Sequence, residues 1–262
     1  MELPTISIIT PCLNAAGTIE EALASVRAQD YPGIEHVVVD GGSTDGTVEI
    51  LERTEGIRFV SEPDRGRPDA ANKGVAMTSG DVIAWLNADD VYEPGALRVV
   101  GEALAAQPDA AWATGYCRII DGEGHETRSR VTAYKNFFLR HYSFGLYLTQ
   151  NFISDPATFV RRSALDRVGL LDERYRWSHD YDLWLRVARL SDPVILRRYL
   201  SSFRMAEGTL SMTGFERQFA EHEECARRRG DGHRLAVWTN ALTSRAIVAI
   251  YRLMRRRRAR AS

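Results

Sequence analysis

The stretch Asp81-Val-Ile-Ala-Trp-Leu-Asn-Ala-Asp-Asp90 joins an apolar run of strand type to Asn87, Asp89 and Asp90. Two like charges about 4 Å apart repel by roughly 4 kcal/mol at an effective dielectric near 20. A divalent cation with an anionic ligand would remove this cost, because Mg²⁺ and Mn²⁺ prefer carboxylate and phosphate oxygens. The alternative is a solvated turn in which an aspartate caps the helix that follows Pro94.

Length and composition are those of a globular chain. At 262 residues the chain can bury a full core, so we expect one α/β domain, or one domain with an appendage. The three cysteines, Cys12, Cys117 and Cys225, are far apart and show no metal-binding spacing, which favours a reducing compartment without disulfides or zinc. The first residues lead directly into an apolar strand rather than a signal peptide, which predicts a cytoplasmic protein.

The near-zero net charge hides an asymmetry between the two ends of the chain. Residues 227–262 contain eleven arginines and one acid, a balance of +10, and the total of −1 therefore leaves −11 for residues 1–226. An acidic body argues against nucleic acid as a partner. The basic end instead predicts contact with an anionic surface.

Apolar runs of strand character alternate with amphipathic segments in units of about 25 residues. We expect strands at 5–10, 36–40, 57–61, 82–86 and 111–120, helices at 19–26, 47–53, 68–77, 94–106 and 215–229, and an extended segment at 194–205. The alternation predicts βαβ crossovers, and therefore an α/β fold with a mainly parallel central sheet flanked by helices.

Polar residues follow the first four strands at corresponding places: Asn14, Asp40, Asp64, and then Asn87 to Asp90. Because ligands bind outside the carboxyl ends of parallel strands, these residues are predicted to share one rim. The rim has neither a P-loop nor a GxGxxG spacing, which argues against a P-loop ATPase or a Rossmann dehydrogenase. Asp40 could accept an N–H of a pyrimidine base, or it could cap the helix that follows.

A second cluster of titratable residues lies in the stretch Trp177-Ser-His-Asp-Tyr-Asp-Leu-Trp-Leu-Arg186. A helix is predicted from Tyr181 onward, with Asp180 at its N-terminus, where the macrodipole stabilises a carboxylate. Helix capping alone would also explain Asp180. His179, Asp180 and Asp182 nevertheless provide what a general base and its orienting partner require.

The end of the chain, residues 235–254, is apolar but interrupted by Asn240, Arg245 and Arg252, so its length and charge argue against a membrane span. At helical spacing it forms an apolar stripe on one side. The stripe consists of Leu235, Trp238, Leu242, Ala246 and Leu253. Two interpretations remain open: an in-plane helix on an anionic leaflet, or a helix docked on the body or on a partner subunit.

Four motifs, in this order along the chain, resemble those of the family 2 glycosyltransferases with a GT-A fold. The motifs are Ile8-Ile-Thr-Pro-Cys-Leu-Asn14, Val38-Val-Asp-Gly-Gly-Ser-Thr-Asp-Gly-Thr47, Leu86-Asn-Ala-Asp-Asp90 and His179-Asp-Tyr-Asp-Leu-Trp-Leu-Arg186. On this resemblance, residues 1–210 form the GT-A domain, with a nucleotide-sugar half at 1–120 and an acceptor half at 121–210. Residues 211–262 would form a helical C-terminal extension with a basic tail.

The resemblance implies that one sugar passes from a nucleotide diphosphate sugar, with a UDP-sugar favoured, to an acceptor hydroxyl with inversion at the anomeric carbon. It assigns donor contacts to Thr10, Pro11, Asn14, Asp40, Asp64, Asp69, Asn72 and Asn87. Asp40 would receive the base, and Asp64, Asp69 and Asn72 would lie under the ribose and diphosphate. The Gln-x-x-Arg-Trp motif of processive members is only faintly matched by residues 173–177, which favours single-sugar transfer.

The Asp-x-Asp metal motif of the family corresponds to Asn87-Ala-Asp89 here, so its first acid is replaced. The resemblance therefore implies a divalent cation, Mn²⁺ or Mg²⁺, at Asp89 and Asp90, with a weakened dependence on metal. The Glu-Asp pair of the family corresponds to His179-Asp180, which makes Asp180 the predicted general base.

The expected acceptor is a glycan or a lipid-linked intermediate in cell-surface polysaccharide or glycolipid assembly. The basic C-terminal helix would then place the protein peripherally on the cytoplasmic face of a membrane. Because Asn87 and His179 replace acids, a non-catalytic module that binds nucleotide sugars or carbohydrate is the alternative.

Overall fold

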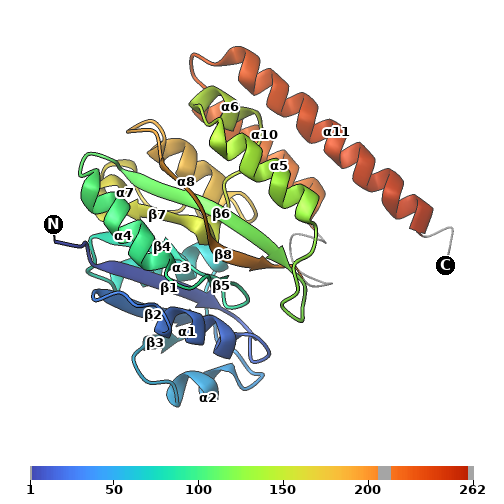
Figure 1. The fold of residues 1–262 in the computed structure, drawn as a ribbon. Coiled ribbons are helices and arrows are strands. Elements are labelled where there is room, and N and C mark those ends of the chain that lie inside the picture. The colour runs from blue at the N-terminus through green and yellow to red at the C-terminus, as the bar shows by residue number, and fades with distance from the viewer. Residues whose placement is uncertain (1, 206–213, 259–262) are drawn as a thin grey trace.

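The computed structural model describes residues 2–205 and 214–258, and of residues 215 and 250–258 it describes the backbone alone. At its centre is an eight-stranded sheet with the strand order β3-β2-β1-β4-β7-β6-β8-β5 (Figure 1). The strands are β1 (Ile6–Cys12), β2 (Ile34–Asp40), β3 (Arg58–Ser61), β4 (Val82–Trp85), β5 (Val91–Tyr92), β6 (Trp112–Ile120), β7 (Thr158–Arg161) and β8 (Val194–Arg204). Helices flank this sheet, so the predicted α/β fold is confirmed.

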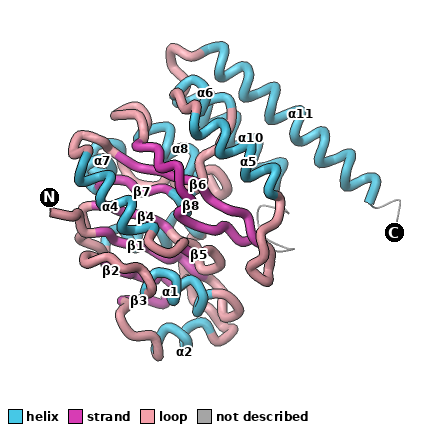
Figure 2. The backbone as a smooth tube through the Cα atoms, viewed as in Figure 1, coloured by secondary structure: helices cyan, strands magenta, loops and turns pink. Residues whose placement is uncertain are grey.

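Helices connect the strands in the first half of the chain and cover the sheet in the second (Figure 2). They are α1 (Ile19–Arg27), α2 (Thr47–Glu52), α3 (Arg67–Ala76), α4 (Ala96–Ala106), α5 (Ser129–Arg140), α6 (Phe144–Thr149), the 3₁₀ turn η1 (Asp155–Ala157), α7 (Arg162–Val168), α8 (His179–Val187), α10 (Phe215–Arg229) and α11 (Arg234–Arg258). Most predicted elements agree with these bounds to within two residues, and α10 matches its predicted range at both ends.

The first half of the sheet is parallel, as predicted. β1 lies between β2 and β4, with Ile6 opposite Ile34 on one side and Val82 on the other. β3 extends the parallel array beyond β2. Because helices cover both faces, every residue of β1 and β4 is buried, which explains why these strands are continuous apolar runs.

Beyond β4 the sheet is mixed, so the predicted mainly parallel sheet is correct only for the first half of the chain. β7 pairs antiparallel with both β4 and β6, β8 is parallel to β6, and β5 pairs antiparallel with β8. Neither β5 nor β7 was predicted. A run of two residues is too short to show a period, and β7 lies outside the alternating strand and helix units of the first half of the chain.

Three tryptophans fix α8 against the sheet. The ring of Trp184 on α8 lies 5.8 Å from that of Trp85 on β4 and 5.8 Å from that of Trp112 on β6, and all three side chains are buried. Aromatic contacts of this kind add about 0.5–1.5 kcal/mol beyond area burial. The start of α8 is therefore held near the carboxyl end of β4.

The two C-terminal helices pack on the rest of the protein. α10 contacts α8, and α11 contacts α10 and α6. Cys225 and Ala226 of α10 belong to the same buried cluster as Trp184. The predicted domain boundary at residues 210 and 211 lies outside the described residues. Within the described part of the chain, no helix is both long enough and apolar enough to cross a bilayer.

Candidate active site

A cleft of about 490 Å³ opens at the carboxyl ends of β1 and β4. Its walls come from the loops after β1, β3 and β4, from the start of α8, from the end of β8 and from α10. Five of the predicted donor or metal residues line it: Pro11, Asn14, Asp64, Asn87 and Asp89. The predicted convergence of separate strand ends on one rim is thus present in the structure.

Thr10 and Asp40 are fully buried and do not line the cleft. The hydroxyl of Thr10 lies 3.0 Å from Nε2 of His36. Asp40 accepts hydrogen bonds from the backbone N–H groups of Gly42 and Ser43 and from the hydroxyls of Ser43 and Ser61. Burial raises the pKa of Asp40, but these hydrogen bonds outweigh it and the net pKa is lowered. Asp40 therefore holds the loop that follows β2 in shape as an ionised carboxylate.

Asp69 and Asn72 lie on α3 away from the cleft lining. Asp69 pairs with Arg65 at 2.8 Å. Asn72 donates to the carbonyl of Leu171 at 2.9 Å and accepts from its N–H at 3.0 Å. Through these contacts both side chains hold α3 in place, and neither side chain lines the cleft.

The two adjacent aspartates after β4 have different surroundings. Asp90 is fully buried and accepts from the N–H of Arg204 at 2.9 Å and from Nδ2 of Asn87 at 2.7 Å. Asp89 lines the cleft. Burial raises the pKa of both groups, and for Asp90 the neighbouring charge of Asp89 adds to the increase.

A divalent cation fits this donor set only if the substrate supplies further ligands. Asp89 offers a carboxylate to the cleft, and the amide nitrogen of Asn87 is engaged by Asp90, which leaves its carbonyl oxygen as the atom able to ligate. In the described ranges no group of three or more His, Cys, Asp or Glu side chains could hold a metal. Mg²⁺ commonly binds through one or two carboxylates plus substrate phosphates and water, so Asp89 and a diphosphate would suffice.

α10 supports the loop that leads into α8. Oε2 of Glu221 accepts hydrogen bonds from the backbone N–H groups of Trp177 and Ser178, each at 2.9 Å. Ser178, the N-cap of α8, makes no side-chain capping bond of its own. A residue from another helix thus satisfies backbone donors just before α8 and fixes the direction in which His179 and Asp180 leave the loop.

Arg67, at the start of α3, connects the carboxylates of the site. Its guanidinium forms an ion pair with Asp155 and donates to Nε2 of His179 at 3.0 Å. Its charge also acts on Asp180 and on Asp89. Sequence reasoning missed Arg67 and Asp155, because they lie 88 positions apart and neither belongs to a recognisable motif.

The pKa values of Asp180 and His179 both lie far from the ordinary values of these side chains. Burial, together with the charge of Asp155, raises the pKa of Asp180 to about 6, although Arg67 acts in the opposite direction. Burial and the charge of Arg67 lower the pKa of His179 to about 3, so this imidazole is neutral and accepts from Arg67. Asp180 is therefore ionised at pH 7 but more basic than an ordinary aspartate.

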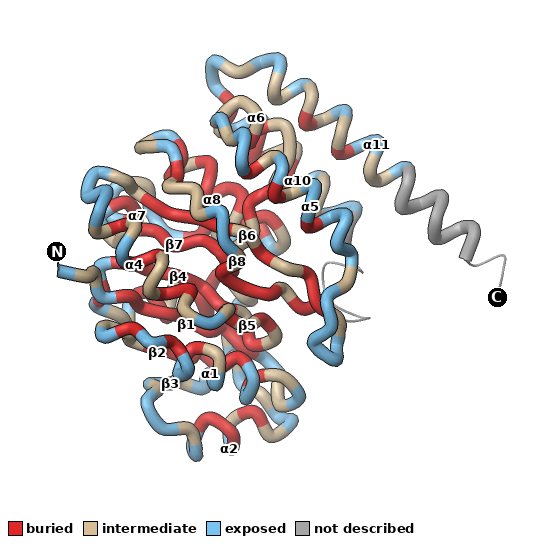
Figure 3. The backbone as a smooth tube through the Cα atoms, in the orientation of Figure 1, coloured by how far each residue is buried: buried red, intermediate tan, exposed pale blue. Residues whose placement is uncertain are grey.

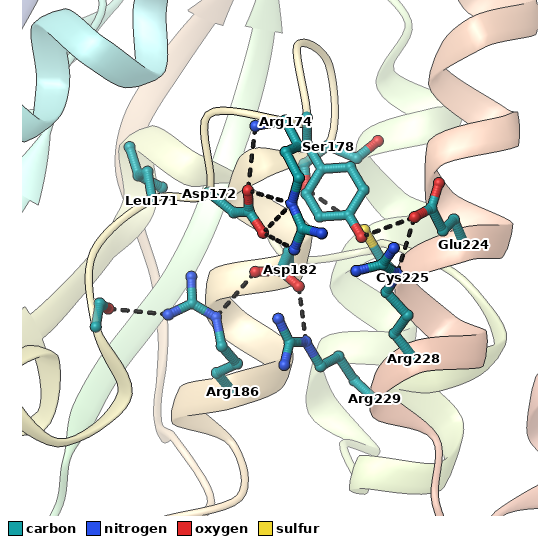
Figure 4. Close-up of polar contacts among 12 residues, drawn as sticks. Leu171, Asp172, Arg174, Ser178, Asp182, Arg186, Glu224, Cys225, Arg228 and Arg229 are labelled. Atoms are coloured by element: carbon teal, nitrogen blue, oxygen red, sulfur yellow. Dashed lines mark hydrogen bonds and ion pairs between the residues drawn. The ribbon is translucent and has the colours of Figure 1, made fainter.

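Asp182 has a purely structural environment (Figure 4). Its buried carboxylate accepts from Nε of Arg186 and from Nε of Arg229, each at 2.8 Å. Arg186 in turn donates to the carbonyls of Val168, Gly169 and Leu170. Of the three titratable residues predicted as base and partner, His179 lines the cleft, Asp180 is partly exposed but is not among the lining residues, and Asp182 ties α8 to α10.

One cationic and one aromatic residue of the cleft come from residues 173–177, the segment that faintly matches the processive motif. Arg176 and Trp177 both line the cleft, and the Arg176 guanidinium lies 5.5 Å from the Trp177 ring. Arg217 of α10 lies 5.8 Å from the same ring. This side of the cleft combines positive charge with an aromatic face, which suits an anionic or sugar ligand.

The sequence model described as glycosyl transferase family 2 matches residues 7–169. The chain belongs to family 2 of the glycosyltransferases. Over 237 residues the enzyme is 32% identical to an uncharacterized glycosyltransferase of Mycobacterium tuberculosis, and the match covers 88% of this chain and 85% of that relative. Over 214 residues it is 31% identical to a PGL/p-HBAD biosynthesis glycosyltransferase of Mycobacterium bovis, with 76% and 75% covered.

Solved structures show the same fold. Residues 1–349 of Staphylococcus aureus TarS, in complex with UDP-GlcNAc, give a TM-score of 0.67 at 17% identity, covering 86% of the enzyme and 66% of that chain. A longer TarS chain is covered over 39% of its length. The mannosyltransferase PcManGT of Pyrobaculum calidifontis, in complex with GDP-Man and Mn²⁺, gives a TM-score of 0.66 at 20% identity. The match covers 95% of the enzyme and 76% of that chain. The predicted GT-A fold is confirmed.

Proposed function

We propose that the enzyme is an inverting glycosyltransferase that moves one sugar from a nucleotide diphosphate sugar to an acceptor hydroxyl, with Asp180 as general base. The main support is the arrangement at the cleft, where Arg67 acts on both Asp180 and Asp89. Asp180 combines a pKa of about 6 with a position beside the cleft-lining His179. A base of this pKa is ionised at neutral pH and still accepts a proton readily.

The donor is proposed to lie along the rim formed by the strand ends, with Pro11, Asn14, Asp64 and Asn87 as direct contacts. Thr10, Asp40, Asp69 and Asn72 would then shape the rim from behind. The neighbouring structures contain UDP-GlcNAc and GDP-Man, which supports a nucleotide sugar as donor. We favour UDP, because the TarS neighbours were solved in complex with UDP and with UDP-GlcNAc.

Asp89 is the proposed protein ligand of a divalent cation, with the Asn87 carbonyl as a second oxygen. Asp90 is already engaged by Arg204 and Asn87, so we propose that it supports Asp89 from behind. When bound, the cation would neutralise charge on the departing diphosphate. The PcManGT complex with Mn²⁺ supports this proposal.

In the proposed reaction the acceptor oxygen attacks the anomeric carbon from the face opposite the diphosphate. A new carbon–oxygen bond forms while the bond to the diphosphate breaks, and the acceptor proton passes to Asp180. General-base help of this kind typically contributes about 10²–10⁴-fold. The charge of Arg67 would help to keep Asp180 ionised near pH 7, and the ion pair with Asp155 would hold Arg67 in place.

The acceptor is proposed to be a glycan or a lipid-linked intermediate. Relatives named in O-antigen and glycolipid biosynthesis support assembly of a surface glycoconjugate. A lipid-linked acceptor would be met at a membrane surface, and we assign that contact to the basic C-terminal helix.

A thermal-shift screen of nucleoside diphosphates, with and without Mn²⁺, tests the donor proposal. A ligand at 100 times its Kd stabilises the native state by about 2.7 kcal/mol, so a UDP-dependent increase in Tm that grows with Mn²⁺ is expected. Absence of a shift with every nucleotide would contradict the proposal. Asp89→Asn should lose the Mn²⁺-dependent part of the shift while Glu123→Gln, an exposed acid in the 121–124 turn, should keep it.

A further inference from the structure

The exposed large apolar side chains of the protein are concentrated on two helices. Among the residues whose side chains are described, eight such side chains are exposed, and six of them lie on α5 or α11. They are Val131, Tyr134 and Phe137 on α5, and Leu235, Trp238 and Leu242 on α11. Neither helix contains an acidic residue, against three cationic residues in α5 and seven in α11. Single exposed leucines need no explanation, but apolar stripes on basic helices do.

α11 turns its polar side toward the body. Asn240 and Ser244 are buried, and Nδ2 of Asn240 donates to the carbonyl of Leu148 at 2.9 Å and to the hydroxyl of Tyr181 at 3.4 Å. Figure 3 shows the described part of α11 mostly as intermediate or exposed, with only isolated buried positions. A helix on a globular body ordinarily buries its apolar face, so the orientation of α11 is reversed.

The outward side of α11 is the apolar stripe. Leu235, Trp238 and Leu242 are 75%, 62% and 46% exposed. Arg234 and Arg245 are exposed beside the stripe, and Arg245 pairs with Glu223 at 3.4 Å. A hollow of about 470 Å³ between α6 and the first turns of α11 also opens beside Leu235. The apolar surface is therefore continuous with a recess and is flanked by positive charge.

We propose that this face of α11 binds the surface of an anionic lipid bilayer. Leucine and tryptophan side chains enter the boundary between headgroups and acyl chains, while arginines beside them reach lipid phosphates. Further along the chain, Arg252 and residues 255–258 add five positive charges without an acid. Basic residues near an anionic leaflet strengthen binding, and salt weakens their contribution. An anionic bilayer offers an apolar interior to the leucine and tryptophan side chains and negative headgroups to the arginines.

A second copy of the chain is less suited to this face. Two α11 helices packed stripe to stripe would bring seven arginines of each copy together with no acid on either helix. Like charges at an interface disfavour association. An anionic leaflet instead attracts the same arginines.

α5 is the second helix that exposes apolar side chains, and its inner side reaches the site. Nζ of Lys135, on the inner side of α5, donates to Ser154 Oγ at 2.9 Å, next to Asp155. The outer side of the same helix exposes Tyr134 and Phe137. Because a helix is about 10 Å across, that outer side lies about one helix diameter from Lys135. We assign α5 as a second bilayer contact; only the lipid-linked nature of the acceptor rests on the proposed function.

Co-sedimentation of the full chain with vesicles tests the proposal. We expect binding to phosphatidylcholine vesicles that contain about one third phosphatidylglycerol, weaker binding at about 0.5 M salt, and little binding to pure phosphatidylcholine. The double variant Trp238→Glu/Leu242→Glu should bind at least about tenfold more weakly. Leu170→Glu, at an exposed leucine outside both helices, is the matched control and should bind as the parent does.

Three results would overturn the proposal. They are a parent protein that does not bind anionic vesicles, a double variant that binds as tightly as the parent, and a parent dimer in sedimentation velocity that the double variant abolishes. Unchanged binding by Phe137→Glu would remove α5 from the surface. Donor-induced increases in Tm, measured on the same samples, separate this proposal from the proposed function, because a double variant that still binds the donor has lost only the membrane contact.

Discussion

At the scale of single residues, the site depends on a partly buried arginine, Arg67, that lies among several carboxylates. Arg67 pairs with Asp155, contacts His179 and lowers the pKa of Asp180, while burial and Asp155 raise it. Asp180 therefore has a pKa of about 6 in the folded protein, and above that pH its ionised carboxylate lowers the free energy of unfolding. The reactivity proposed for Asp180 and its cost to stability therefore have the same physical origin.

We predict opposite effects of Asp180→Asn on activity and on stability. Transfer should fall by about 10²–10⁴-fold. The native pKa of about 6 exceeds the ordinary 3.8, so the native state binds more protons than the unfolded state between these values. Stability of the parent therefore falls as pH rises through about 4 to 6, and the variant should be more stable at pH 8 by up to about 3 kcal/mol.

Urea unfolding of both proteins at pH 4 and pH 8 checks the stability part of this prediction. Most of the gain should be gone at pH 4, where the native aspartate is protonated and the unfolded one is only about half ionised. A variant that is less stable than the parent at pH 8 would show that ionised Asp180 is not strained in the native state.

The pH dependence of transfer is a separate prediction. kcat/KM should reach a plateau above about pH 6 and fall tenfold per pH unit below it, because the base must be ionised. Arg67→Met should move this limb to higher pH, since the Arg67 charge lowers the pKa of Asp180. Arg167→Met, at an exposed arginine on α7, should leave the profile unchanged. Identical profiles for all three proteins would contradict the assigned role of Arg67.

At the scale of elements, α8 is held by groups from other helices. Glu221 of α10 accepts from the backbone before it, Trp184 packs on the sheet, and Asp182 binds Arg186 and Arg229. Figure 4 shows the arginines of α8 and α10 meeting at Asp182. Breaking a buried ion pair leaves an uncompensated charge and typically costs about 3–5 kcal/mol.

Asp182→Ala should therefore lower the free energy of unfolding by about 3–5 kcal/mol. Asp172→Ala is the matched control, since Asp172 pairs with Arg174, whose side chain is 61% exposed, and exposed pairs contribute about 0–1 kcal/mol. Urea unfolding at pH 7 measures both. Equal losses for the two variants would mean that the Asp182 network contributes no more than a surface pair.

At the scale of the whole molecule, α10 is part of the core and α11 is attached to the outside of the body. Cys225 and Ala226 are fully buried with the residues of α8, and α11 is tied to α6 through Asn240. The predicted division into a domain at 1–210 and an extension at 211–262 stays a prediction. The contacts of α10 argue that the first part does not fold alone.

Two shortened chains check this point. A chain that ends at residue 210 loses the apolar contacts of α10, the Glu221 acceptor and Arg229, and should show no cooperative thermal transition by circular dichroism. A chain that ends at residue 232 loses only α11 and should fold with a lower Tm. A cooperative transition in the shorter chain would establish residues 1–210 as an independent domain.

The sequence by itself determined the parallel half of the sheet and the motifs at its strand ends, and it placed Asp180 at the start of a helix. These features are local, because each depends on a strand or helix and the few residues that follow it. The apolar stripe of α11 was equally visible. Its members share a helical face by spacing alone.

Only the tertiary structure decided which distant groups meet. Arg67 finds Asp155 and His179 across 88 and 112 positions, and β7 enters the sheet antiparallel as a run of four residues. The stripe of α11 faces outward because Asn240 finds acceptors at Leu148 and Tyr181 on the body. Such pairings depend on how elements pack, and no short-range pattern encodes a contact between groups that are far apart along the chain.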